Sequence, residues 1–282
     1  MKKLLSLLLA SVLCVSLLAA CGGEPAAPET EGEGETTPAV DETNALIVGF
    51  DPEFPPFGFK NELNEYDGFD LALAKEVCER LGWEFTPQPI DWNSKDAELK
   101  AGSINCIWNG FTMNGREDQY TWSDPYVDNS IVVVVKADSG IKTLADLAGK
   151  KVMAQSGSSA SDAINDNTEF KDSLADVIEL ADYNMGFMEL EQGSVDAVAV
   201  DLGVGTYQMG AKEGNYVMLD EPIAQEQYAI GFLKGNDALR DKVNDTLKEI
   251  AADGTMLAIA QNYVEEGLVL ESLCMIQGEA DE

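Results

Sequence analysis

The amino-acid sequence predicts an α/β fold built from two lobes. Short apolar strands alternate with amphipathic helices from about residue 45 to residue 108, and a similar alternation starts again near residue 144. Between them lies Ser130–Lys136, an apolar stretch of strand length without a helical partner nearby. Two α/β units joined by two long strands would bind a ligand in the cleft between them, where strands end and helices begin.

The first unit is predicted to contain three strands and two helices. Its first helix carries Leu73, Val77 and Leu81 at the spacing of one helix face. The predicted elements are, in order, a strand at Ala45–Phe50, a helix at Phe69–Leu81, a strand at Trp83–Thr86, a helix that includes Ala97–Ala101, and a strand at Ile104–Trp108.

The second unit repeats this pattern and is followed by C-terminal helices. We expect those helices to return to the first lobe, which would then comprise 44–132 and 230–282 and leave 133–229 to the second lobe. The predicted elements are a short helix at Leu144–Gly149, a strand at Lys151–Gln155, a helix start at Ser159–Ile164, a strand at Val177–Leu180, a helix at Met185–Glu191, a strand at Val195–Val200 that leads into a helix through Met209, a strand at Tyr228–Leu233, and helices at Ala238–Ala252 and Thr255–Val264.

The N-terminus has the features of an export signal. Lys2 and Lys3 precede an apolar run, Leu4–Leu18, that is too short to span a membrane comfortably, and small residues then precede Cys21. This order resembles the lipobox of bacterial lipoproteins. The resemblance implies that residues 1–20 are a signal peptide and that a lipid on Cys21 anchors the chain to the bilayer. An ordinary cleavage site that happens to lie near a cysteine is the alternative.

Residues 21–43 have the composition of a tether. They are rich in Glu, Pro, Gly and Thr and contain no aromatic residue. Such a segment buries too little apolar surface to offset its conformational entropy, so we expect a disordered acidic linker between the lipid and the folded body.

Composition excludes several classes of partner and site. The chain has 51 acidic and 18 basic residues, a formal net charge of −33, which disfavours nucleic acid and anionic lipid headgroups. It contains no histidine, so a catalytic histidine and a histidine-ligated zinc are excluded. Cys78, Cys106 and Cys274 show no metal-type spacing, and we interpret Cys78 and Cys106 as core thiols. No cofactor and no metal are expected.

A segment suited to binding a carboxylate follows the third predicted strand. Gly110 offers free backbone groups, Thr112 a hydroxyl, and Arg116 a guanidinium whose fork can hold both oxygens of a carboxylate. A solvated surface arginine is the alternative interpretation of Arg116.

Two further segments lie where strands are predicted to end. Ser158 and Ser159 start a helix, where backbone N–H groups and hydroxyls favour an anion. Asp201 ends an apolar strand and could accept hydrogen bonds from an ammonium group. The alternative for the serines and for Asp201 is that they simply cap the helices that follow.

Two aromatic residues could flank a ligand side chain. Phe54 lies in a proline-rich loop after the first strand, and Trp92 follows the second strand. Trp92 could instead belong to the core.

Taken together and in order, these motifs resemble the family 3 extracellular solute-binding proteins, the polar amino-acid receptors of ABC importers. The resemblance runs from about Ala45 to Val264 and implies the periplasmic-binding-protein type II fold, with two lobes that close on the ligand about a two-strand hinge. The segments that carry it are Val48–Asp51, Phe54–Phe57, Gly68–Ala72, Ser123–Tyr126, Leu144–Val152 and Ala252–Thr255.

The resemblance also implies a role for each candidate residue. The turn from Thr112 to Arg116 is one residue shorter than is common in the family, and Phe54 replaces the commoner tyrosine. By similarity, the α-carboxylate would be held by Arg116, Thr112, Ser159 and Ser158, the ammonium by Asp201 and the Gly110 carbonyl, and the side chain by Phe54 and Trp92 on its flanks with Asp51 and Asn109 at its far end.

The implied protein is a monomeric, lipid-anchored receptor on the outer face of a bacterial membrane, which passes a free amino acid to ABC permease subunits and catalyses nothing. The alternatives are an enzyme on the same fold, such as a cyclohexadienyl dehydratase with Glu53 or Asp51 as its acid, and a non-transport sensor lipoprotein. The ligand side chain stays open, because Asp51 and Glu53 suit a cation whereas Asn109 suits an uncharged polar group.

Overall fold

The computed structural model describes residues 44–212 and 214–277, all within one compact unit. The predicted signal peptide, Cys21 and the acidic tether lie outside the described residues. Within those residues, no helix is long and apolar enough to cross a membrane.

The first lobe is built on a five-stranded sheet with the strand order β5-β1-β6-β14-β7. Strands β5, β1 and β6 run parallel, and β14 is antiparallel to β6 and β7. The strands are β1 (Ala45–Phe50), β5 (Glu84–Pro89), β6 (Cys106–Ile107), β7 (Thr121–Trp122) and β14 (Gly231–Phe232), and the helices of this lobe are α1 (Phe69–Leu81), α2 (Lys95–Ala101), α7 (Asp237–Ala252), α8 (Thr255–Ala260) and α9 (Cys274–Gln277).

The second lobe is built on a six-stranded sheet with the order β10-β9-β11-β8-β12, in which β13 also pairs with β8. Parallel strands β10, β9 and β11 alternate with helices, whereas β12 and β13 run antiparallel to β8. The strands are β8 (Val127–Lys136), β9 (Lys151–Gln155), β10 (Asp176–Leu180), β11 (Ala197–Asp201), β12 (Tyr216–Met218) and β13 (Ala224–Tyr228), and the helices are α3 (Ser159–Asp166), α4 (Thr168–Ser173), α5 (Tyr183–Gln192) and α6 (Leu202–Ala211).

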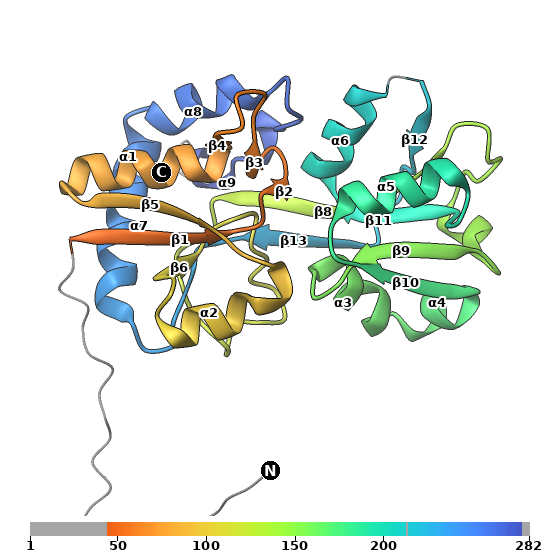
Figure 1. Cartoon of the computed structure of the whole chain (residues 1–282), viewed down its shortest axis with the longest axis horizontal. Helices are drawn as coiled ribbons and strands as arrows, with labels where there is room; N and C mark the ends of the chain where they lie inside the picture. Colours follow the sequence, from red (N-terminus) through yellow and green to blue (C-terminus); the bar gives the residue numbers. More distant parts are fainter. Residues whose placement is uncertain (1–43, 213, 278–282) are drawn as a thin grey trace, which may run out of the picture. The chain divides into compact units, whose positions relative to one another are not determined.

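Two neighbouring antiparallel strands connect the lobes. The start of β8 pairs with β13 over five residues, and β13 is followed directly by β14 in the sheet of the first lobe. Figure 1 shows β8 and β13 running side by side between the two groups of elements. The C-terminal helices α7 and α8 pack on α1, so the chain does return to the first lobe. The residue boundaries predicted for the lobes remain a prediction.

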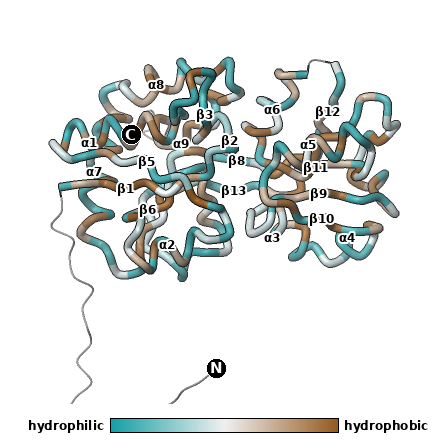
Figure 2. Tube along the Cα trace, in the orientation of Figure 1, coloured by the Kyte–Doolittle hydropathy of each residue, from teal (hydrophilic) through white to brown (hydrophobic). Residues whose placement is uncertain are grey.

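Hydrophobic residues lie along the inner strands and the helix faces turned toward them. All five residues of β11 are buried, and the last three residues of β1 are buried as well. Figure 2 shows these strands as hydrophobic, whereas the loops at the periphery are hydrophilic. The predicted interpretation of Cys78 and Cys106 as core thiols agrees with their burial, since both are almost fully buried and free.

Most predicted elements have the expected place, and several have the expected bounds. Strands β1 and β9 and helix α1 begin and end where the sequence predicts. Helix α1 ends because Gly82 adopts a left-handed conformation (φ 67°), from which its N–H group bonds back to the last turn.

Several predicted elements were wrong in extent, and three of them differ in kind as well. The run Tyr228–Leu233 is not one strand, because Ala229 and Ile230 donate their N–H groups to Phe111 and Ser123 rather than to a strand partner. The C-terminal helix ends at Ala260 and continues as a 3-10 turn, and Leu144–Leu147 is a 3-10 helix. The small sheet of β2 (Glu53–Phe54), β3 (Gly58–Lys60) and β4 (Tyr66–Asp67) was not predicted, nor were α4, β7, β12, α9 and all of β13 before Tyr228.

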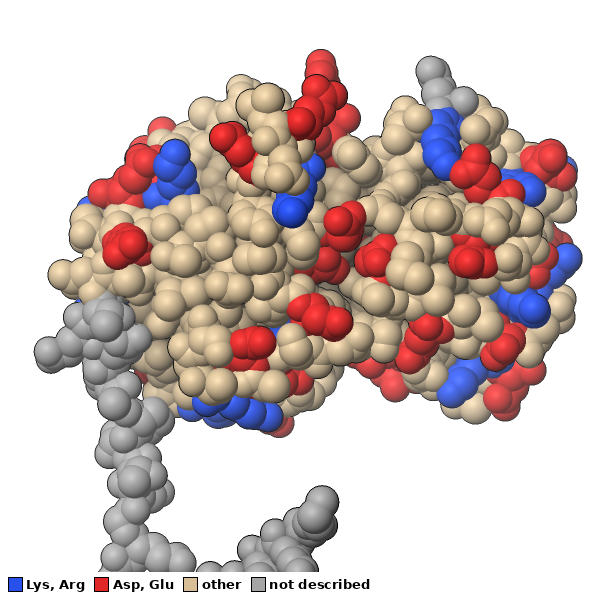
Figure 3. Space-filling view, in the orientation of Figure 1, with Lys and Arg blue, Asp and Glu red and all other residues tan. Residues whose placement is uncertain are grey.

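Acidic side chains are spread over both lobes. On the face shown in Figure 3 they outnumber Lys and Arg and do not gather in one patch. This distribution matches the net charge of −33 and disfavours a polyanionic partner on that face.

Candidate functional site

A cavity between the two lobes brings nine of the ten predicted site residues together. It leaves only about 10 Å³ for the centre of a water-sized sphere, so the side chains nearly fill it. Gln155 is the one lining residue that the sequence did not single out, and Asp51 is the one predicted residue that does not line it. The lining residues are Phe54, Trp92, Asn109, Gly110, Thr112, Arg116, Gln155, Ser158, Ser159 and Asp201.

Arg116 supplies positive charge at one end of this cavity. Its Nη1 donates to the carbonyl oxygen of Thr112 at 3.3 Å, and its Nη2 pairs with Oδ2 of Asp162 at 2.6 Å. Its guanidinium also lies over the Phe111 ring, 5.5 Å from the ring centre. The side chain is only 11% exposed, which contradicts the alternative of a solvated surface arginine.

Helix α3 begins at the same cavity. Ser158 caps it by accepting a hydrogen bond from the Ser161 N–H at 3.2 Å, while its own hydroxyl donates to the Gln155 carbonyl at 2.7 Å. The cap fixes the direction of the first turn, whose free N–H groups carry partial positive charge. Ser158 therefore acts as a helix cap and also lines the cavity.

Asp201 is a buried carboxylate at the end of β11. Its oxygens accept hydrogen bonds from Asn129 Nδ2 at 2.9 Å and from the hydroxyls of Tyr228 and Tyr183 at 2.5 and 3.4 Å. Although it precedes α6, its side chain makes no capping hydrogen bond, so the helix-cap alternative was wrong. Burial, and next the neighbouring Glu226 carboxylate, raise the pKa of Asp201 to about 7.

Glu226 was missed in the sequence and lies beside these residues. Its Oε1 accepts hydrogen bonds from the Thr112 hydroxyl at 2.6 Å, the Ser159 hydroxyl at 3.0 Å and Asn129 Nδ2 at 2.9 Å. Burial raises the pKa of this carboxyl as well. The only signal in the sequence is alternation along β13, which places Glu226 on the same buried face as Tyr228.

Asp51 lies behind the cavity rather than in it. Its Oδ2 accepts a hydrogen bond from Gln155 Nε2 at 2.6 Å, so Gln155 stands between Asp51 and the cavity. The expectation that Asp51 touches the far end of a ligand stays a prediction, and in this structure Asp51 bonds to Gln155, which lines the cavity. Burial raises the pKa of Asp51 to about 6.

Asn109 does line the cavity. Its Oδ1 accepts from the Asp51 N–H at 2.9 Å, whereas its buried Nδ2 has no hydrogen-bond partner among the described residues. A buried donor of this kind favours an acceptor oxygen nearby.

The two predicted aromatic residues are both nearly buried and both line the cavity. Phe54 packs against Tyr183, with ring centres 6.0 Å apart, and Trp92 stands edge-to-face on Phe111 at 5.5 Å. Trp92 belongs to a small hydrophobic cluster with Phe111, so the core and cavity interpretations of this residue hold together.

Several side chains connect the lobes directly, and we call these four pairs the inter-lobe contacts. They are polar, and each joins a residue of the first lobe to a residue of the second. They are Arg116 with Asp162, Gln155 with Asp51, Lys95 Nζ with the Gly157 carbonyl at 3.3 Å, and Asn184 with Glu53.

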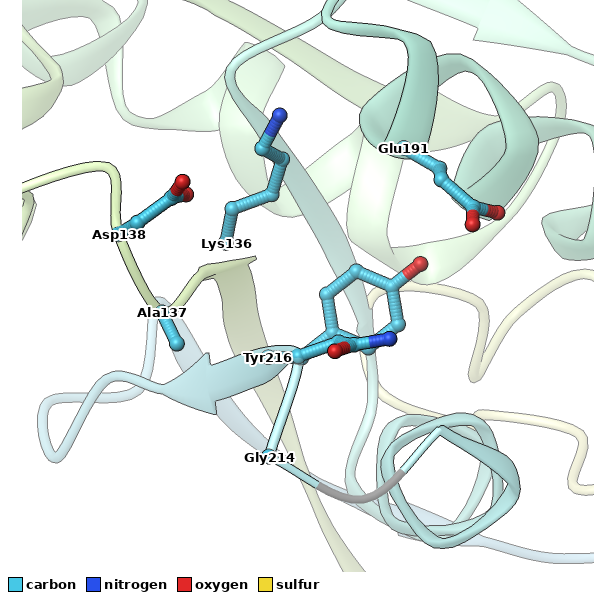
Figure 4. A pocket seen from close by; sticks show the side chains of 7 residues that line it. Lys136, Ala137, Asp138, Glu191, Gly214 and Tyr216 are labelled. Carbon is cyan, nitrogen blue, oxygen red and sulfur yellow. The ribbon is translucent and has the colours of Figure 1, made fainter.

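A second hollow lies on the second lobe, at the ends of β8 and β12. Figure 4 shows Lys136, Asp138 and Glu191 around the Tyr216 ring. The hollow is lined by one lobe alone and by charges of both signs, and Glu191 is already paired with Lys212. These residues therefore do not repeat the arrangement between the lobes, where a buried carboxylate and an arginine line one cavity.

Residues 46–266 match the model of the bacterial extracellular solute-binding proteins, family 3. This chain belongs to that family. Among its relatives is the ABC transporter glutamine-binding protein GlnH of Bacillus subtilis (strain 168), 32% identical over 274 residues, which span 94% of this chain and 98% of that protein.

Solved structures of amino-acid-binding proteins share the fold. A substrate-binding protein of an ABC uptake transporter from Streptococcus pneumoniae, with bound histidine, superposes with a TM-score of 0.76 at 31% identity, covering 80% of this chain and 94% of that chain. An ancestral arginine-binding protein bound to arginine gives 0.73 at 35%, covering 78% and 98%. The predicted type II fold of two α/β lobes is therefore confirmed.

Proposed function

We propose that this family 3 protein binds a free polar amino acid in the cavity between its lobes and delivers it to an ABC importer. The observation that carries this proposal is the pairing of opposite charges across one small cavity. Arg116 and the start of α3 suit a carboxylate, and Asp201 suits an ammonium group. An α-amino acid presents both groups at a fixed short distance.

Both lobes contribute to the proposed contacts. Gly110, Thr112 and Arg116 come from the first lobe, whereas Ser159 and Asp201 come from the second. A ligand that touches both sides stabilises the arrangement in which the lobes are together, and its differential contacts supply the free energy for closure.

The uncharged amides of Asn109 and Gln155 favour a polar side chain as the ligand. The unpaired Nδ2 of Asn109 would donate to an acceptor oxygen of that side chain, as a carboxamide provides. Asp51 acts through Gln155 and supports this subsite at a distance. Because GlnH of Bacillus subtilis is described as glutamine-binding, L-glutamine is the first ligand to test, with L-arginine and L-histidine next.

A thermal-shift screen of the mature chain against the twenty amino acids and cystine tests the proposal. We expect a raised melting temperature with one amino acid or a few, followed by one-site binding in calorimetry. The D-enantiomer of the best ligand is the matched control, because it cannot place carboxylate, ammonium and side chain in the same three subsites. No shift with any compound would overturn the proposal.

The lipid anchor belongs to this proposal and is supported by Cys21 and the tether sequence. Replacing Cys21→Ser is expected to release the protein from the membrane fraction while leaving amino-acid binding intact. Delivery to an importer is tested separately, by ligand uptake in cells with and without the chain. Binding without any effect on uptake would favour the sensor alternative.

Catalysis is the alternative that needs an acid in the cavity. Neither Asp51 nor Glu53 lines it, since Asp51 lies behind Gln155 and Glu53 is bonded to Asn184 at the edge. Asp201 is the carboxyl that does line the cavity, and we assign it to the ligand ammonium because three donors already hold its oxygens. We therefore propose binding without turnover. Conversion of prephenate or arogenate by the purified chain would contradict this.

A further inference from the structure

A second buried carboxylate, Glu226, lies beside Asp201 and accepts hydrogen bonds from Thr112 and Ser159, two residues that line the proposed amino-acid site. The two carboxylates lie on strands that flank β8. Asp201 at the end of β11 is paired with Ile131, and Glu226 on β13 is paired with Asn129 two residues away on the same face of β8. The Nδ2 group of Asn129 consequently donates to both, at 2.9 Å to Asp201 Oδ1 and 2.9 Å to Glu226 Oε1.

Glu226 also decides which way two hydroxyl groups of the cavity point. Thr112 donates to Glu226 Oε1 at 2.6 Å, and Ser159 donates to the same oxygen at 3.0 Å. A hydroxyl has one proton to give, so a Thr112 hydroxyl that donates to Glu226 offers its lone pairs to Ser159, whose Oγ lies 3.1 Å from Thr112 Oγ1, or to a ligand. The Thr112 hydroxyl thereby becomes an acceptor suited to an ammonium group, which differs from the carboxylate role implied by family resemblance.

The surroundings of the pair contain little positive charge. Tyr183 and Tyr228 face Asp201 with their hydroxyls, and Arg116 is the cation that acts on Glu226. Arg116 is itself engaged by Asp162. Both carboxylates are buried, and they share a single amide donor, Asn129. Because two negative charges so placed repel each other, a state in which the two groups share one proton is favoured.

We propose that Glu226 and Asp201 together form the ammonium subsite, and that the α-ammonium group of the ligand replaces a proton held by this pair. The proposal rests on the proposed amino-acid site and adds a residue and a proton to it. In the step, a carboxyl O–H bond breaks, the proton leaves to the solvent, and the carboxylate oxygen accepts a hydrogen bond from the incoming ammonium. Glu226 thus supplies, with Asp201, the negative charge that pairs with the ligand ammonium, and it also positions the hydroxyls of Thr112 and Ser159.

Calorimetry in buffers of different ionisation enthalpy measures the proton directly. L-glutamine and L-arginine are titrated into the mature chain at about pH 6.5, in phosphate, imidazole and bis-Tris buffers. We expect the observed enthalpy to depend on the ionisation enthalpy of the buffer in the way that proton release requires, with about one proton released per ligand bound. We also expect the affinity to rise as the pH is raised from about 6 to 8. An enthalpy independent of the buffer would overturn the proposal.

Glu226→Gln is the informative variant, because the amide keeps the shape and the acceptor oxygen but removes the second charge. We expect proton release to fall and the pH dependence of affinity to move to lower pH, since the pKa of Asp201 then loses the effect of the neighbouring carboxylate and keeps only that of burial. Glu221→Gln, on the exposed loop before β13, removes the same charge away from the cavity and should change neither quantity. Unchanged proton release in Glu226→Gln would also overturn the proposal.

A ligand-free measurement separates this inference from the proposed function. If neither L-glutamine nor L-arginine binds, the proposed function fails for these ligands. Protonation of Glu226 and Asp201 is then measured without ligand, by infrared difference spectra between about pH 6 and 8. Asp51 and Asp70 are buried with raised pKa values as well and contribute their own C=O bands, so the native chain is compared with Glu226→Gln. We expect the native spectrum to contain a C=O band that the variant lacks, and identical band patterns in the two chains would contradict a shared proton whether or not an amino acid binds.

Discussion

Asp201 illustrates how a single side chain is prepared for a charged partner before any partner arrives. It is 2% exposed, and Asn129, Tyr183 and Tyr228 fix both of its oxygens. Burying a carboxylate costs free energy that these three donors offset only in part, as its raised pKa of about 7 indicates. An ammonium group beside it would supply the missing positive charge.

Asp201→Asn is therefore expected to weaken amino-acid binding by roughly 100-fold, because the ligand ammonium would be left buried without its counter-charge. The amide is nearly the same size as the carboxylate, so folding should survive. Calorimetry measures the change, and Asp172→Asn on the exposed face of α4 is the matched control. An affinity within threefold of the native value, which corresponds to a change in binding free energy of at most about 0.65 kcal/mol, would show that Asp201 does not contact the ligand.

Arg116→Lys tests geometry at constant charge. One guanidinium can donate at the same time to the Thr112 carbonyl, to Asp162 and to a ligand carboxylate, whereas an ammonium is a compact point charge. We expect roughly tenfold weaker binding, or about 1.4 kcal/mol. Arg80→Lys on α1, where Arg80 pairs with Glu76 and Asp253, is the control and should bind normally. Equal affinity of Arg116→Lys and the native chain would exclude bidentate recognition.

The turn that follows β6 depends on one glycine. Gly110 has φ +55°, and a Cβ atom there would lie 2.8 Å from the Phe54 ring and 3.1 Å from the Tyr228 ring. Its N–H group also donates to the buried Asp70 at 2.6 Å. The backbone therefore approaches two aromatic rings more closely than any side chain would permit.

Gly110→Ala is expected to lower the free energy of unfolding by at least ~2 kcal/mol and to weaken ligand binding, since strain and overpacking add. Gly102→Ala is the matched control, because Gly102 has φ +76° but nothing within 4 Å of the added methyl. Its cost should be about 1 kcal/mol, with binding unchanged. Urea denaturation measures both variants, and equal losses would mean that only the backbone conformation matters.

Elements with strong apolar periodicity were predictable, and elements made of polar residues were not. Helix α1 carries Leu73, Val77 and Leu81 on one face and ends at a glycine, so its bounds follow from local rules. Strand β13 reads Ala-Gln-Glu-Gln-Tyr, which resembles a loop, and its extended form comes from pairing with β8. Glu226 was missed for this reason, because a tertiary contact buries it.

The predicted site residues came together because strand ends meet at one edge of each sheet. Phe54, Thr112 and Asp201 were found from their positions after strands. Gln155 and Asp51 could not be separated in this way, since both follow strands and only the packing shows that one covers the other. Asn129 lies inside a strand and gave no signal of its own.

At the scale of the whole molecule, buried acids make folding sensitive to pH. Burial raises the pKa of Asp51 to about 6, and that of Asp70 and of Asp201 to about 7. Each carboxyl binds its proton more tightly in the folded chain than in the unfolded chain. Their stabilising contribution is therefore complete below about pH 4 and is lost as the pH rises through 6 to 7.

The free energy of unfolding is accordingly expected to be larger at about pH 5.5 than at pH 8, by ~2 kcal/mol or more. Partial neutralisation of a chain with a net charge of −33 acts in the same direction. Urea denaturation at both pH values measures the difference. Asp51→Asn should reduce it, whereas the exposed Asp172→Asn should not, and a chain more stable at pH 8 would contradict the assignment of raised pKa values.

The inter-lobe contacts have a consequence for how affinity and selectivity can change independently. Lys95 with the Gly157 carbonyl, and Asn184 with Glu53, hold the lobes together through protein atoms alone. Their free energy is added to the binding of every amino acid equally, so loosening them would raise all dissociation constants by one common factor. The preference for one amino acid over another would stay the same. Mutations at this rim could thus tune the receptor to the concentration of its ligand in a habitat without changing which ligand it selects.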